Sequence, residues 1–315
     1  MMEYMRATFL NTTAAPVLAL LLNALAWGVA WWPFRQLQSL GLHPLWATAC
    51  IYGLAASVIG LWRPQALGQV VRLPSLWGIL IASGLTNAAF NWAVSIGDVV
   101  RMVLLFYLMP LWSLLLARRL LGEAVTAGAC VRAVLAVVGA ACVLAGPAAA
   151  VGDMRASSAS LADALALLAG FAFALNTLLL RRAAVVPREG RAMAMFLGGA
   201  LVAGAAATLL SGAGDAASLA VTWPGAAAAW VLPVVGLALA FLGVNLCLQY
   251  AVARLSARVT AVVLPCEVLF AAVTAVWWGG ASLHLGLVVG GVCILSAAMA
   301  SVWGHARAAS NMVSE

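Results

Sequence analysis

The chain has 315 residues, of which 66% are hydrophobic and only 8% are charged. Soluble domains carry about 25% charged residues, and disordered chains are poor in apolar ones, so both classes are excluded. All sixteen basic residues are arginines in short clusters between apolar runs, giving a net charge of +7 with no stretch suited to nucleic acid. The composition therefore predicts an integral membrane protein whose partner is the lipid bilayer.

Apolar runs long enough to cross a bilayer recur along the chain, since a spanning helix needs about 20 such residues. Ten runs qualify, which predicts an all-α membrane protein of ten transmembrane helices: 16–34, 43–62, 74–94, 98–119, 125–146, 160–181, 190–211, 226–250, 256–278 and 283–304. The chain then divides into an N-terminal segment 1–15, a five-helix unit 16–146, a linker 147–159, a second five-helix unit 160–304 and a tail 305–315.

The arginines predict the orientation. With ten spans both termini lie on one side, and positive charge is enriched on the cytoplasmic side. One side collects twelve arginines, whereas the other holds Arg35, Arg101 and Arg155, and Arg132 lies within the fifth predicted helix. We therefore expect a multi-pass protein of a bacterial-type inner membrane with both termini cytoplasmic.

The second half of the chain repeats the first. At an offset of 158 residues, Asn87 meets Asn245, Trp92-Ala93-Val94 meets Tyr250-Ala251-Val252, and Ala117 meets Ala275; the register continues through Gly128 and Gly286. At an offset of 146, Trp27-Gly28 with Arg35 meets Phe173-Ala174 with Arg181. Because each unit has an odd number of helices, the two copies are predicted to be inverted, which suits a carrier whose central site faces each side in turn.

Several short motifs carry a family resemblance. Trp27-Gly28, Trp92-Ala93-Val94, Pro110 and Leu121-Gly122-Glu123 resemble the first repeat of the drug/metabolite transporter superfamily, in its EamA-type ten-helix form. Tyr250-Ala251-Val252 and Glu267-Val268 are similar to its second repeat, although Val268 replaces the usual proline. The resemblance implies a central cavity lined by helices 1, 3, 4, 6, 8 and 9, with helices 5 and 10 packed outside.

One further motif is similar to a single branch of this superfamily. Tyr107-Leu108-Met109-Pro110, preceded by Asn91, resembles the aromatic amino-acid exporters. The resemblance implies a secondary transporter that exports small metabolites by alternating access, with amino acids favoured and aromatic ones first among them.

Two amide pairs are the first candidate substrate ligands. Asn87 and Asn91 share one face of a predicted helix, and the repeat places them on Asn245 and Gln249. Unpaired polar groups in hydrocarbon are costly, so each needs a partner. The pairs could bind the ammonium and carboxylate of a substrate, or they could hydrogen-bond neighbouring helices.

Glu267 is the only carboxylate near the middle of a predicted span. Ionisable groups at this depth mark proton or ion pathways. Two readings stay open: Glu267 couples transport to protons, which are then a further partner, or it is a structural acid, with Arg132 as a candidate neighbour.

Aromatic side chains lie beside further amides. Asn23 and Trp27 share a face of helix 1, Phe173 and Asn176 share a face of helix 6, and Trp92 and Tyr107 complete the expected substrate site. Such walls suit an amphipathic ligand, although helix packing explains any one of them equally well. Two prolines within helices, Pro110 and Pro265, predict kinks.

The sequence weighs against other classes of protein. It contains no phosphate-binding loop, no metal-ligand spacing and no paired carboxylates at depth, so no cofactor or metal is expected and an intramembrane enzyme is the weaker alternative. A passive facilitator or exchanger of another small metabolite or drug, with the same fold, remains open.

Overall fold

The computed structural model describes residues 2–122, 126–145, 152–183, 185–211, 221–225, 229–255, 259, 263, 266–279 and 284–312. Over these residues every regular element is a helix, which confirms the predicted all-α class. The helices are α1 (Met2–Val29), α2 (Trp31–Ser39), α3 (Pro44–Trp62), α4 (Pro64–Arg72), α5 (Ser75–Ile96), α6 (Val99–Phe106), α7 (Met109–Leu121), α8 (Ala127–Ala145), α9 (Gly152–Arg182), α10 (Arg188–Ser211), α11 (Val231–Val252), α13 (Cys266–Gly279) and α14 (Leu285–Met312).

In the part of the chain that the structure describes, ten apolar helical segments appear in the predicted order. Seven are long and apolar enough to cross a membrane, and α1 with α2, like α6 with α7, makes up one of them. Three are shorter, at Ala127–Val143, Cys266–Gly279 and Leu285–Ala297, and they correspond to the fifth, ninth and tenth predicted spans. A multi-pass membrane fold is therefore supported, and the count of ten spans stays a prediction.

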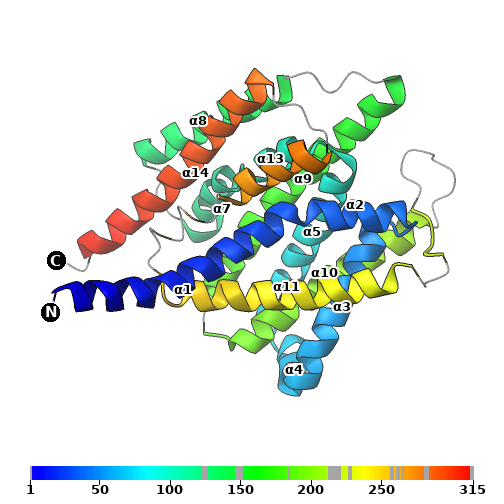
Figure 1. Cartoon of the computed structure of the whole chain (residues 1–315), viewed down its shortest axis with the longest axis horizontal. Helices are drawn as coiled ribbons and strands as arrows, with labels where there is room; N and C mark the ends of the chain where they lie inside the picture. The colour runs from blue at the N-terminus through cyan, green and yellow to red at the C-terminus, as the bar shows by residue number, and fades with distance from the viewer. Residues whose placement is uncertain are drawn as a thin grey trace.

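The helix contacts support the predicted repeat. In the repeat, α5 is equivalent to α11 and α9 is equivalent to α1. The contact of α5 with α9 therefore has an equivalent in the contact of α11 with α1, and both contacts are present. The contact of α1 with α13 corresponds likewise to that of α9 with α6 and α7. Two pairs, α3 with α10 and α8 with α14, map onto themselves, and Figure 1 shows α8 and α14 running side by side along one flank.

Close helix contacts depend on glycine. A Cβ added to Gly28 of α1 would lie 2.7 Å from the Cβ of Phe270, so these two backbones meet where α13 carries its acid. Gly139 of α8 would likewise place a Cβ 2.7 Å from the carbonyl oxygen of Gly290 on α14. In hydrocarbon, small residues at such points allow the van der Waals contact that holds helices together.

The predicted fourth helix is interrupted. It consists of α6 and α7, with Tyr107 and Leu108 between them and Pro110 in the first turn of α7. A proline fits a first turn because it lacks the N–H that would otherwise be unbonded there. Gly122 then ends α7 in the left-handed conformation, with φ 68°, as glycine commonly does. Glu123 and Pro265 lie outside the described residues, so the second predicted kink stays a prediction.

Candidate substrate cavity

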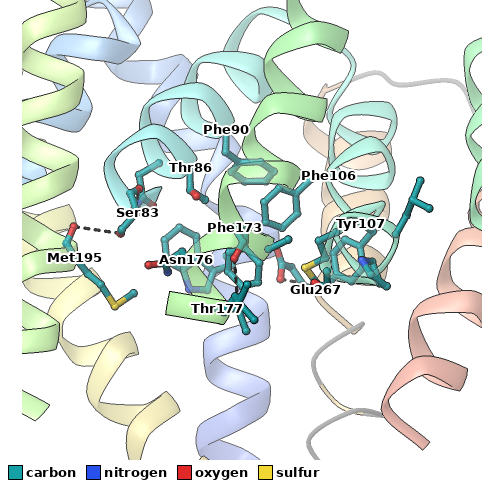
Figure 2. Close-up of a pocket in the computed structure, with 18 of the residues that line it drawn as sticks. Ser83, Thr86, Phe90, Phe106, Tyr107, Phe173, Asn176, Thr177, Met195 and Glu267 are labelled. Carbon is teal, nitrogen blue, oxygen red and sulfur yellow. Dashed lines mark hydrogen bonds between the residues drawn. The ribbon is translucent and has the colours of Figure 1, made fainter. Parts of the chain in front are cut away.

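A cavity of about 610 Å³ opens inside the helical bundle. Its walls are mostly apolar, and Figure 2 shows the facing side chains of Phe90, Phe106 and Phe173 beside the polar groups of Asn176 and Glu267. The size falls within the range of small-molecule sites, which combine apolar walls with few polar groups. The described part of the molecule therefore contains a site suited to a small amphipathic compound.

The cavity extends toward one end of the bundle. We call this the arginine-rich end, because nine described arginines lie there, at the ends of α3, α4, α7 and α9, at the start of α10 and just after α11: Arg63, Arg72, Arg118, Arg119, Arg181, Arg182, Arg188, Arg191 and Arg254. Ala117, Ala129, Arg181 and Leu248 line the cavity on this side, near the ends of their helices. At the opposite end, Arg35 and Arg101 lie within packed groups of helices, described below.

Seven of the ten predicted substrate ligands line this cavity. They are spread over α1, α5, the break between α6 and α7, α9 and α11: Asn23, Trp27, Asn87, Tyr107, Phe173, Asn176 and Asn245. Glu267 and Pro110 line it as well. The fold thus brings together groups that are up to 244 residues apart in sequence (Asn23 to Glu267, 267 − 23).

Three predicted ligands lie elsewhere. Asn91 is buried, and its amide donates to Thr48 Oγ1 of α3 at 3.1 Å. Trp92 packs edge-on against His43 with ring centroids 5.2 Å apart. Gln249 is exposed and donates to Asn245 Oδ1 within its own helix at 2.6 Å. The structure does not bring these three side chains to the cavity.

Asn87 and Asn91 lie on one face of α5, but only Asn87 lines the cavity. Asn87 accepts from the Tyr52 hydroxyl at 2.6 Å, and Asn91 bonds Thr48, so both amides face α3. Tyr52 and Thr48 are themselves one helical turn apart, which makes this an interhelical ladder. Hydrogen bonding between helices, the alternative reading of the pair, accounts for these contacts.

Two other side chains that line the cavity carry an amide oxygen without a partner. Asn23 and Asn176 are 2% and 3% exposed, and the Oδ1 of each lacks a hydrogen-bond partner within the described structure. Buried polar atoms are nearly always satisfied, so an orphan pair needs an explanation. Because both side chains line the cavity, a donor group of a bound ligand is the partner that fits.

Glu267 lies at the start of α13, against the helix break. Tyr107 is 3% exposed, and its hydroxyl donates to Glu267 Oε2 at 3.3 Å (Figure 2). The break between α6 and α7 thus positions a donor for the only acid that lines the cavity in the described residues. Two cations, Arg132 and Arg181, line the same cavity.

Sequence reasoning missed several lining residues. Ser83 and Thr86 share a face of α5 with Asn87 and Phe90, at spacings of three, four and seven residues, which is the signal that could have found them. Tyr52, Met195 and Phe196 also line the cavity. The fifth predicted helix, which is α8 in the structure, was expected to pack outside the cavity, and that expectation was wrong.

The reason lies in the side chains of α8, the fifth predicted helix. One face of α8 carries small residues, and this face lets the helix lie close to the cavity. Its lining residues are Ala129, Ala133 and Ala136, beside Arg132. The α14 helix, which packs on the other face of α8, contributes no lining residue within the described chain.

A clamp of charged groups lies at the opposite end. Arg101 of α6 donates to both carboxylate oxygens of Asp163 on α9, at 2.8 and 2.6 Å. It also donates to the carbonyl oxygen of Val143 on α8 at 3.1 Å. Three helices are therefore joined by one guanidinium group.

Comparison with known proteins fits this architecture. Residues 14–145 match the EamA-like transporter family, within the drug/metabolite transporter superfamily, so the first half of the chain carries an EamA-like transporter domain. A solved structure, described only as "Crystal structure of protein", is 20% identical with a TM-score of 0.54, over 91% of this chain and 96% of that one. At that identity the likeness shows the fold alone. No curated protein matches the chain.

These findings bear on the general class of the protein. Over residues 14–145 the family match confirms the predicted superfamily, and the apolar helices agree with a multi-pass membrane protein. Residues 14–145 thus resemble a family of membrane transporters of small molecules.

Proposed function

We propose that this EamA-like transporter is a secondary carrier that exports amino acids, aromatic ones first, across a bacterial-type inner membrane by alternating access. In this reading the arginine-rich end is cytoplasmic, as the distribution of positive charge favours. The cavity then faces the cytoplasm, from which an exported substrate is loaded.

The observation that carries the proposal is the pair of orphan amide oxygens. Asn23 Oδ1 and Asn176 Oδ1 are buried acceptors at a cavity that also holds the carboxyl group of Glu267. Three acceptors on side chains that line one cavity suit an ammonium group, which has three donors and no acceptor. Arg132 and Arg181 supply the opposite charge for a carboxylate, and an amino acid presents both groups.

The walls support an aromatic side chain. Trp27 stacks on Phe241 with centroids 5.0 Å apart, and Phe106 meets Phe173 edge-on at 5.3 Å. Aromatic rings prefer such offset and edge contacts, which contribute about 0.5–1.5 kcal/mol beyond area burial. A phenylalanine or tyrosine ring bound among them would make contacts of the same kind.

Flux in proteoliposomes tests the proposal. Labelled phenylalanine is the probe, with and without an imposed pH gradient, for the wild type and for Glu267→Gln. We expect saturable flux that the gradient accelerates in the wild type and no longer accelerates in the variant. Flux indifferent to both changes would indicate a facilitator with a structural Glu267. No flux above empty liposomes, from folded protein, would refute the amino-acid assignment.

A matched pair of asparagine variants tests the binding site. Asn176→Ala removes the unpartnered oxygen of a side chain that lines the cavity, whereas Asn91→Ala removes an amide that is equally buried but bonded to Thr48 outside the cavity. Losing a ligand hydrogen bond to a charged group costs about 1.5–3 kcal/mol. We expect the KM for phenylalanine to rise about tenfold or more for Asn176→Ala and to stay near wild type for Asn91→Ala. Equal KM values for the two variants would argue against the orphan oxygens as ligands.

A further inference from the structure

Arg35 holds the opposite end of the bundle closed. From α2 it donates Nε to the carbonyl oxygen of Val94 at 3.2 Å and Nη2 to that of Gly97 at 2.5 Å. Its guanidinium carbon also lies 5.0 Å from the centre of the Trp31 ring. The last carbonyls of a helix have no partner within the helix and carry the negative end of its dipole. One arginine thus fastens α2 to the C-terminal end of α5.

The repeat places the same groups at the arginine-rich end. Arg35 corresponds to Arg181 at the offset of 146, while Val94 and Gly97 correspond to Val252 and Leu255 at the offset of 158. There, however, the cavity lies between the two helices, because Thr177 and Arg181 of α9 and Leu248 of α11 line it. The helices α2 and α5 are packed against each other, whereas the equivalent helices α9 and α11 have the cavity between them.

A second pair of equivalent residues shows the same asymmetry. Ala117 on α7 and Ala275 on α13 correspond in the repeat. Ala117 lines the cavity, whereas Ala275 is 1% exposed within the hydrophobic core. Identical side chains at equivalent positions are therefore accessible at one end and buried at the other. A two-state carrier built from such repeats reaches its other state by exchanging these environments.

We infer that Arg35 and Arg181 act alternately as the fasteners of the two ends, an inference that rests on the proposed transporter function. In the present state Arg35 holds α5, and the cavity faces the arginine-rich end. In the other state Arg181 donates to the carbonyl oxygens of Val252 and Leu255, Arg35 releases Val94 and Gly97, and the cavity faces the opposite end. In each state one of the two arginines makes charge-assisted hydrogen bonds to carbonyl oxygens at the end of the neighbouring helix.

Cysteine labelling of the full chain measures this exchange without a substrate. In a background with the native cysteines replaced, Ala117→Cys reports on the arginine-rich end and Ala275→Cys on the opposite end. The readout is the ratio of their maleimide labelling rates. We expect Arg35→Gln to slow labelling at 117 and speed it at 275, and Arg181→Gln to do the reverse. Arg182→Gln is the matched control, since the neighbouring arginine donates to the carbonyl oxygen of Leu120 instead.

The expected size is about a tenfold change in the ratio for each variant, equivalent to ~1.4 kcal/mol. Shifts of opposite sign for Arg35→Gln and Arg181→Gln, with the control unchanged, would establish the exchange. No shift, or shifts of the same sign, would overturn it. Arg35→Lys keeps the charge but loses the planar fork, so it should give a smaller shift of the same sign if Arg35→Gln does not fold. Failure here would leave the flux result standing, because labelling requires no transport.

Discussion

Asp163→Asn provides the sharpest test of what holds the opposite end together. The wild-type side chains of Arg101 and Asp163 are 12% and 16% exposed, so water screens the pair weakly. The substitution keeps the shape of the carboxylate and removes its charge, which leaves a largely buried guanidinium without its ion-pair partner and with only the Coulomb attraction of Asp98. Breaking a buried pair in this way costs about 3–5 kcal/mol. Part of that cost is recovered because the asparagine oxygen can still accept one hydrogen bond, so we expect about 3 kcal/mol.

The assay is thermal unfolding in detergent with a double-mutant cycle. At roughly 2 °C per kcal/mol, Asp163→Asn should lower the apparent Tm by about 6 °C. The variant Arg101→Gln with Asp163→Asn leaves no charge unpaired and should be more stable than the sum of the single changes predicts, by at least ~1 kcal/mol. A Tm for Asp163→Asn within a degree of wild type, or strictly additive effects, would refute the reasoning.

Two further predictions follow from local geometry. Gly28→Ala should lower the apparent Tm by several degrees, because the added Cβ would lie 2.7 Å from the Glu267 carbonyl oxygen. Gly236→Ala is the control: its Cβ meets nothing within 4 Å, so this substitution should leave the apparent Tm unchanged or raise it. Equal effects of the two substitutions on Tm would contradict the packing argument. Burial lowers the pKa of His43 to about 4, so this side chain is neutral when folded and binds a proton on unfolding. Stability should therefore fall as the pH drops from about 6.5 toward 4. His43→Asn keeps a cap for the Leu45 N–H and should reduce that dependence in Tm measurements at pH 7.5 and 5; an unchanged slope would assign it to other groups.

The helical architecture could be predicted from the sequence because the bilayer imposes a simple length rule. The seven helices long enough to cross a membrane coincide with predicted spans, and the three shorter ones lie where the remaining spans were expected. Pro110 predicted an interruption of the fourth predicted helix, but it did not predict where α6 ends and α7 begins. The two residues between the helices, Tyr107 and Leu108, precede the proline, and Tyr107 contacts Glu267.

The site was harder to predict, since helical spacing gives a shared face but not what that face meets. Asn87 and Asn91 do share a face, and it is directed at α3. Asn23 and Asn176 had no repeat signal and were singled out only for their aromatic neighbours, yet they carry the orphan oxygens. Which polar group stays unsatisfied depends on the packing of several helices, and no local pattern encodes it.

Some lining residues differ between equivalent positions of the two five-helix units. In the register that places Ala117 on Ala275, Met109 corresponds to Glu267 and Arg132 corresponds to Gly290. Met109, Arg132 and Glu267 all line the same cavity. The acid is thus supplied by one unit alone and this arginine by the other, so a twofold scaffold encloses a site with opposite charges at non-equivalent positions. A symmetric site would bind a symmetric ligand equally well in two orientations, whereas this one favours a single orientation of a compound carrying both charges. The amino acid of the proposed function is such a compound, and in the proposed exchange its orientation relative to Glu267 would be preserved while the helices move around it.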